Sequence, residues 1–178
     1  MLPELTTERL ILQETQLEDA PFLEAYQNSP EHWELQAVEP IHFADGVKRV
    51  KGYMKFRGKG ANRRLYDFVA RTKDTNVFIG QVSIERSSPA LASIGFSVAR
   101  EHRGQGFAAE MASRIIAFGF DVLDLHRISA DVAIQNTVCR HIMEKIGMSF
   151  EGAARDCIWA QGRWWTEAKY AILECDPR

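Results

Sequence analysis

The 178-residue sequence lacks the features that mark several specialised protein classes. It has three cysteines, Cys139, Cys157 and Cys175, and no two lie close enough to predict a disulfide framework or zinc-ligand spacing. No apolar run is long enough to span a bilayer. The first residues also lack the basic stretch and apolar segment that are typical of a signal peptide. These absences predict a cytoplasmic protein without a metal site and without a membrane partner.

An excess of charge of either sign is also missing. Lysine and arginine number 22 against 24 acidic residues, which gives a net charge of −2 and does not favour a nucleic-acid partner. Hydrophobic residues make up 46% and charged residues 26%, which is ordinary globular composition. A chain of this length can bury a sizeable core, and we expect one domain over residues 1–178.

The hydrophobic pattern predicts an α/β fold in which hairpins and strand-helix-strand units alternate. Together these units indicate a mixed sheet with helices on both faces. Residues 30–43 carry two prolines and no clear period, so we expect mostly loop there. The predicted helices cover Glu18–Gln27, Asp45 to about Arg57, Gly106 to about Leu123 and Asn136–Ile146. The predicted strands cover Arg9–Leu12, Leu65–Arg71, Val77–Glu85, Ser93–Val98, Arg127–Ala133, Ser149–Ala160 and Trp164–Glu174.

The turn Arg103–Ala108, between the strand Ser93–Val98 and a helix, predicts an anion site. The first N–H groups of a helix have no partners within the helix and carry partial positive charge. Gly104 and Gly106 lack a Cβ, so a phosphate can approach the backbone closely, and Arg103 adds a positive charge. The turn is neither a P-loop, which needs Gly-Lys-Ser/Thr, nor a dinucleotide fingerprint, which needs a third glycine.

The same turn resembles the Arg/Gln-x-x-Gly-x-Gly/Ala motif of the GNAT superfamily of N-acetyltransferases, which binds the coenzyme A pyrophosphate through backbone amides. Ile94–Val98 looks like the fourth strand of that family. Asn136–Met148 resembles its Asn-x-x-Ser-x-x-Val-Met-Glu-Lys-Leu-Gly-Phe helix. Thr7–Leu12 and Tyr170–Leu173 match as well, so the resemblance covers nearly the whole chain in order. The most similar subgroup is the Rim-type ribosomal-protein-alanine/serine N-terminal acetyltransferases.

The resemblance implies a GNAT fold and an acetyl-CoA site. The fold is a mostly antiparallel mixed sheet of about six to seven strands, splayed between the fourth and fifth strands. The pantetheine arm lies in that gap and pairs with the main chain of Phe96 and Val98. The cofactor-binding residues that follow from the matched motifs are Phe96, Ser97, Val98, Arg103, Gly104, Gln105, Gly106, Phe107, Ala108, Asn136 and Arg140.

The implied activity is direct attack of a primary amine on the thioester of acetyl-CoA. An α-amino group has a pKa of about 7.7–8.0 and lysine about 10.4, so an N-terminal amine needs little help from a base. We therefore expect the N-terminus of a protein, such as a ribosomal protein, as the acceptor. A small amine such as a polyamine, amino sugar or amino acid is the alternative, and a non-catalytic CoA-binding regulator is a third. Either a monomer or a homodimer fits.

The catalytic end departs from the family pattern at two positions. Cys139 stands where the family has a serine proposed as the acid, and it either donates a proton to the leaving thiolate or simply packs in the core. Ser93 stands where relatives often carry a glutamate. Glu85 is our candidate base, with other candidates at Glu151, Glu167 and His141. Residues 31–43 either line the acceptor site or form an ordinary surface loop.

Overall fold

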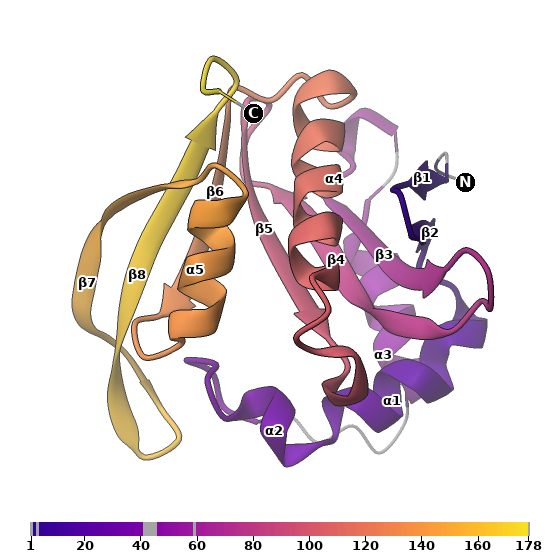
Figure 1. Cartoon of the computed structure of the whole chain (residues 1–178), viewed down its shortest axis with the longest axis horizontal. Coiled ribbons are helices and arrows are strands. Elements are labelled where there is room, and N and C mark those ends of the chain that lie inside the picture. Colours follow the sequence, from indigo (N-terminus) through magenta and orange to yellow (C-terminus); the bar gives the residue numbers. More distant parts are fainter. Residues whose placement is uncertain (1, 3, 41–45, 59, 178) are drawn as a thin grey trace.

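The computed structural model of the protein describes residues 2, 4–40, 46–58 and 60–177. A single eight-stranded sheet runs through it in the order β1-β2-β3-β4-β5-β6-β8-β7 (Figure 1). The strands are β1 (Leu5–Thr6), β2 (Leu10–Glu14), β3 (Leu65–Thr72), β4 (Phe78–Arg86), β5 (Leu91–Val98), β6 (Arg127–Ala133), β7 (Ser149–Ala160) and β8 (Arg163–Leu173). The α-helices are α1 (Ala20–Gln27), α2 (Pro30–Trp33), α3 (Gly46–Phe56), α4 (Phe107–Asp121) and α5 (Thr137–Lys145).

The predicted mixed sheet is confirmed. Every pair of neighbouring strands is antiparallel except β5 and β6, which are parallel. The sheet has one strand more than the six to seven expected, because Leu5 and Thr6 pair with β2 as a short edge strand. Two residues are too few to show an alternating pattern, so no pattern in the sequence indicates this strand.

The prediction of loop after Pro30 is wrong for its first four residues. Pro30–Trp33 forms the short helix α2, with Pro30 in the first turn and the preceding Ser29 in an extended conformation. Proline is well tolerated there because the first helical N–H groups have no partner in any case. The predicted cap of the next helix, Asp45, lies outside the described residues, and α3 begins at Gly46.

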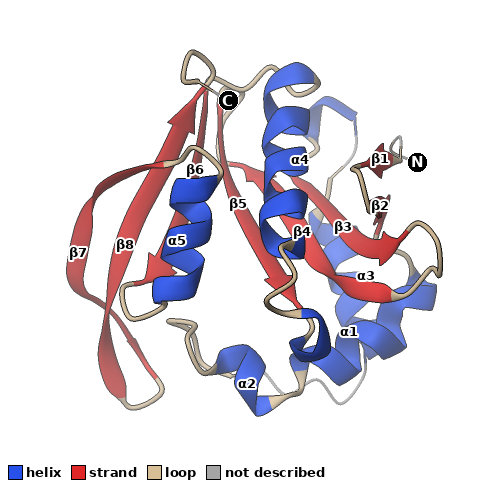
Figure 2. Cartoon of the chain, viewed as in Figure 1, coloured by secondary structure: helices blue, strands red, loops and turns tan. Residues whose placement is uncertain are grey.

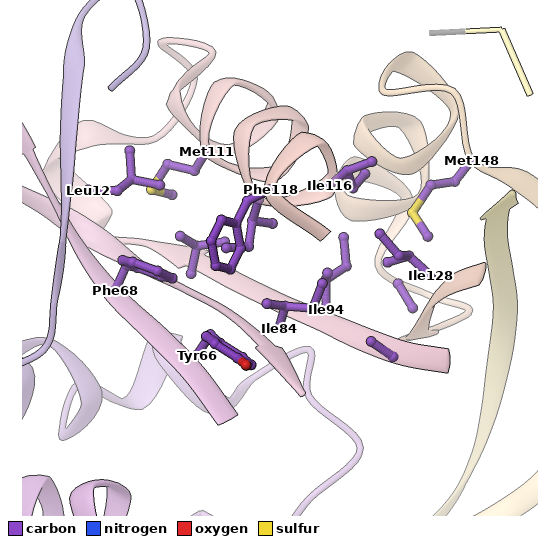
Figure 3. Close-up of a cluster of buried hydrophobic side chains, with 14 of the residues drawn as sticks. Leu12, Tyr66, Phe68, Ile84, Ile94, Met111, Ile116, Phe118, Ile128 and Met148 are labelled. Carbon is purple, nitrogen blue, oxygen red and sulfur yellow. The ribbon is translucent and has the colours of Figure 1, made fainter. Parts of the chain in front are cut away.

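The main core lies between the sheet and helices α4 and α5. Alternate side chains of the central strands, such as Phe68, Ile84 and Ile128, are buried on this face. They meet Met111 and Phe118 of α4, as Figure 3 shows. The strand pattern therefore turns one apolar face towards these two helices, which lie in front of the sheet in Figure 2.

The opposite face of the sheet carries α1 and α3. Leu23 of α1 and Val50 of α3 pack with Val69 and Phe78 of the sheet in a second, smaller cluster. Helices α1 and α3 therefore cover β3 and one end of β4 on this face of the sheet. Within the described residues, no helix has both the length and the apolar character that crossing a bilayer requires.

A buried ion-pair network ties α3 to the first strands. Just after α3, Arg57 donates from Nε to Oδ1 of Asp67 at 2.6 Å and from Nη2 to Oδ2 at 2.9 Å. Nη2 also reaches the carbonyl of Thr15 at 2.5 Å, and Nη1 lies 3.3 Å from Glu14. The side chain of Asp67 is only 1% exposed. Removing one partner would therefore leave a charge in a place where water cannot compensate it.

We expect Asp67→Ala to lower the free energy of unfolding by about 3 kcal/mol, because the Arg57 guanidinium would lose its bidentate partner inside the protein. Urea unfolding measures this effect. Glu151→Ala is the matched control, since it breaks an exposed pair with Arg127 and should cost less than about 1 kcal/mol. Equal losses of unfolding free energy in the two variants would contradict this prediction, because the buried network would then stabilise the protein no more than an exposed ion pair does.

Candidate active site

The parallel strands β5 and β6 pair over a short stretch and then part. Their register runs from Leu91 opposite Arg127 to Ser93 opposite Ser129, and no pair follows. Both strands nevertheless continue, β5 to Val98 and β6 to Ala133. The predicted splay between these two strands is therefore present, and it opens towards their carboxyl ends.

On β5, the main chain of Phe96 and Val98 faces the gap. Ala99 donates to Ile79 of β4 at 2.9 Å, and Ser97 lies opposite Gln81. Along an antiparallel pair of strands, residues whose main chain hydrogen-bonds to the partner strand alternate with residues whose main chain points away from it. Ser97 therefore turns its main chain to β4, while Phe96 and Val98 turn theirs to β6. The carbonyl of Val98 accepts a bond from Nε of Arg103 at 3.2 Å, and its N–H remains directed at the gap.

On β6, the main chain of Asp131 and the N–H of Ala133 face the gap, while the carbonyl of Ala133 accepts a bond from the N–H of Asn136 at 2.8 Å. Ile134, just after β6, donates to Thr166 of β8 at 3.0 Å, and the same alternation turns the odd-numbered residues of β6 towards β5. Unpaired backbone groups along two strand edges are costly unless something bonds to them. An extended ligand with amide groups can do so, as an added strand does.

The turn at the end of β5 presents a row of free amides. Gly104 has φ 76° and Gly106 has φ 83°, both in the left-handed region, and α4 begins at Phe107. Among the described residues, the N–H groups from Gly104 to Phe107 have no hydrogen-bond acceptor in the protein. A Cβ on Gly104 would meet nothing within 4 Å, so the outer side of the turn is open. Such a turn at a helix start fits a diphosphate.

Asn136, at the predicted start of this helix, caps α5. Its Oδ1 accepts a bond from the N–H of Cys139 at 3.0 Å. Within the described part of the chain, its Nδ2 donates to no protein group, so capping leaves one donor of this side chain free. The two roles considered for Asn136, helix cap and partner of the pantetheine arm, are compatible because they use different atoms.

Cys139 and Arg140 follow in the first turn of α5. Cys139 is half-buried at the border of the main core, and burial raises the pKa of its thiol to about 11, so the thiol is neutral. Arg140 donates to Oη of Tyr170 at 3.3 Å and lies 3.5 Å from the carbonyl of Ile134. Cofactor binding by Arg140 stays a prediction, since its contacts here are within the protein.

The four candidate bases lie in different surroundings. Glu151 is held by Arg127 through two bonds of 2.6 and 2.5 Å, and these bonds hold its pKa below the usual range. His141 is exposed on α5. Glu85 lies opposite Ser93, at the closed end of the gap. Glu167 lies opposite Ala133, at the open end.

The segment that follows α2 is anchored at the open end of the gap. Nε2 of Gln161 donates to the carbonyls of Trp33, Gln36 and Val38 at 3.0, 2.8 and 2.9 Å. Ala37 packs in a small cluster with Ala133, Ala160 and Trp165. Sequence reasoning missed Gln161, although it lies between the predicted strands Ser149–Ala160 and Trp164–Glu174. Of residues 31–43, positions 41–43 lie outside the described residues.

Comparisons with known proteins agree on one family. Residues 9–149 match the family described as the acetyltransferase (GNAT) domain. The chain is 32% identical over 164 residues to the uncharacterized N-acetyltransferase p20 of Bacillus licheniformis, with 89% of each chain covered.

Solved structures with bound coenzyme A have the same fold. The spermidine N-acetyltransferase of Vibrio cholerae, in complex with CoA and spermine, gives a TM-score of 0.83 at 24% identity over 94% of this chain and 96% of that one. The RimL ribosomal L7/L12 alpha-N-protein acetyltransferase, in complex with CoA, gives 0.84 at 16% identity over 96% and 98%.

We expect Gly106→Val to weaken CoA binding by more than about tenfold while the protein stays folded. Valine does not tolerate φ 83°, and its side chain would crowd Nη2 of Arg9, which lies 3.5 Å from the Cβ position, so the amides of the turn would lose their orientation. Calorimetric titration measures the affinity. Gly162→Val is the control, because φ is 70° there and the residue lies in the β7–β8 turn. Unchanged CoA affinity in Gly106→Val would refute the placement of the pyrophosphate.

Proposed function

The chain belongs to the GNAT family of acetyl-CoA-dependent N-acetyltransferases, and on that premise we propose that it acetylates the N-terminal α-amine of a polypeptide. Acetyl-CoA supplies an acetyl group activated as a thioester. The free amides of Gly104–Phe107 suit its diphosphate, and the unpaired edges of β5 and β6 suit its amide-bearing arm. The residues present therefore fit this cofactor.

The openness of the sheet beside the gap supports a polypeptide acceptor. Ser93 and Gly95 belong to a central strand, yet both are exposed on the face opposite α4. Helices α1 and α3 pack around Val69 and Phe78 and leave this region uncovered. A polypeptide can enter such a face with its N-terminus first, whereas a small ligand is usually bound in an enclosed pocket.

We propose that three groups of the chain assist the transfer. The N–H of Val98 faces the gap and can donate to the carbonyl oxygen of the acetyl group as negative charge develops there. Nδ2 of Asn136 can donate to the arm of the cofactor. The neutral thiol of Cys139 can donate to the sulfur that leaves.

We expect peptides with free N-termini to be better acceptors than spermidine in a thiol-release assay. For such peptides kcat/KM should rise with pH and level off above about pH 8, where the α-amine is neutral. A lysine or polyamine acceptor would instead keep rising towards about pH 10. Peptides with blocked N-termini are the control. Faster turnover of spermidine than of every peptide would contradict the proposal.

The low pKa of an α-amine also limits how much a general base can contribute to kcat/KM. With a peptide acceptor at pH 8, Glu85→Gln and Glu167→Gln should each lower kcat/KM by less than about tenfold, because deprotonating an α-amine there costs under about 1 kcal/mol. A much larger loss in either variant would show that the carboxylate does more than assist this step.

We expect Cys139→Ala to lower kcat by roughly 100-fold and Cys139→Ser to stay within about tenfold of wild type, since only serine keeps a donor for the leaving sulfur. Because the thiol pKa of about 11 is raised by burial, this donor should be lost only as the pH rises through that value. Cys157→Ala, at an exposed cysteine of β7, is the control. Equal kcat in wild type and Cys139→Ala would assign this residue to packing alone.

A further inference from the structure

Arg9, at the start of the first long strand, lies against the turn that precedes α4. Its Nη1 donates to the carbonyl of Gln105 at 3.0 Å. Its Nε and Nη2 lie 2.8 and 2.7 Å from Oε2 of Glu110. The guanidinium also covers the ring of Phe107, at 4.3 Å from the ring centroid. One planar group therefore contacts the turn, the first residue of α4 and the residue one helical turn further along.

The bond to Gln105 determines where the next amide points. The carbonyl of Gln105 and the N–H of Gly106 belong to one peptide group, and the described chain has no cis peptide bond. In a trans peptide these two groups point in opposite directions. When Arg9 holds the carbonyl on the inner side, the N–H of Gly106 must point outwards, away from Arg9.

Arg9 is itself held in place. Oε1 of Glu110 accepts bonds from Oγ1 of Thr7 at 2.5 Å and from the N–H of Arg9 at 2.9 Å. Burial alone would raise the pKa of Glu110, but the bonds from Thr7 and Arg9 hold that pKa below its ordinary value. The carboxylate therefore stays charged, and both ends of Arg9 are anchored before any ligand arrives.

We propose that Arg9 is a positioning residue for the CoA pyrophosphate: by bonding the Gln105 carbonyl on the inner side of the turn, it orients the N–H of Gly106 towards the ligand. This inference rests on the proposed CoA-binding role of that turn. Arg9 need not touch the ligand, because its charge is already paired with Glu110. Its contribution is preorganisation: the turn loses its conformational freedom on folding rather than on binding.

Arg9→Met keeps an apolar side chain over Phe107 and removes the side-chain bonds to Gln105 and Glu110, while the backbone bond from residue 9 to Glu110 remains. We expect the Kd for CoA and the KM for acetyl-CoA to rise about tenfold, in line with a charge-assisted bond of about 1.5 kcal/mol. At saturating acetyl-CoA, kcat and the acceptor KM should stay within about twofold, since the gap and the acceptor face are unchanged.

Arg114→Met is the matched control. Arg114 also lies on the interface between α4 and the N-terminal strands, and its Nε donates to the carbonyl of Thr6 at 3.1 Å. It has no bond to the turn. This variant should lose similar thermal stability and keep its affinity for CoA. If both variants weaken CoA binding equally, Arg9 only holds the helix against the strands and the proposal is wrong.

The affinity for dephospho-CoA shows which phosphate groups of the ligand depend on Arg9. It retains the diphosphate and lacks the 3′-phosphate, so Arg9→Met should weaken its binding by the same factor as that of CoA. A loss confined to CoA would mean that Arg9 serves the 3′-phosphate, which overturns the proposal. Arg9→Lys can still bond the carbonyl of Gln105 but cannot make two side-chain contacts with Glu110, so it should recover part of the affinity for CoA. It replaces Arg9→Met in these measurements if Arg9→Met unfolds.

Failure of this inference can be told apart from failure of the proposed function. If the wild-type protein binds CoA tightly and Arg9→Met binds it equally well, only the positioning role is lost. If the wild-type protein does not bind CoA at all, the role of the turn itself is wrong.

Discussion

The parting of β5 from β6 is the constraint on which the rest of the site depends. These strands form the one parallel pair of the described sheet, and their pairing stops at Ser93 and Ser129. Beyond that point both strands still bury one face, with Ile94 and Val132 in the main core. Both strands therefore continue as ordered parts of the core without bonding to each other, and the described sheet keeps backbone groups along this gap that a ligand or water can satisfy.

The two binding segments follow directly from this divergence. Parallel strands send their continuations to the same edge of a sheet, so the turn after β5 and the cap of α5 after β6 both lie at the open end of the gap. Arg103 ties the turn back to Val98, and Asn136 accepts a bond from Cys139 of α5 through Oδ1, while among the described residues its Nδ2 stays free. The proposed diphosphate site and the gap between the strands are thus joined by the segments that directly follow β5 and β6.

The acceptor side is built from distant segments. Gln161 in the β7–β8 turn holds the chain after α2 against the end of β6, with 123 to 128 positions between the bonded residues. Glu31 of α2 also pairs with Arg100, just before the turn that leads into α4. The residues that we propose to shape the acceptor entrance are therefore linked to both the sheet and the proposed cofactor end, while Ser93 and Gly95 beside the gap are exposed.

The sequence by itself determined the features whose causes are local. Alternating apolar residues gave the strands, two glycines gave the left-handed turn before α4, and Asn136 gave the cap of α5, because each depends on neighbours within one turn or one strand. Only the tertiary structure decided which distant groups meet. The contact of Arg9 with Glu110 spans 101 positions, and the choice of Glu85 and Glu167 over Glu151 at the gap depends on strand register. Packing and register join such residues, and no local pattern in the chain encodes either one.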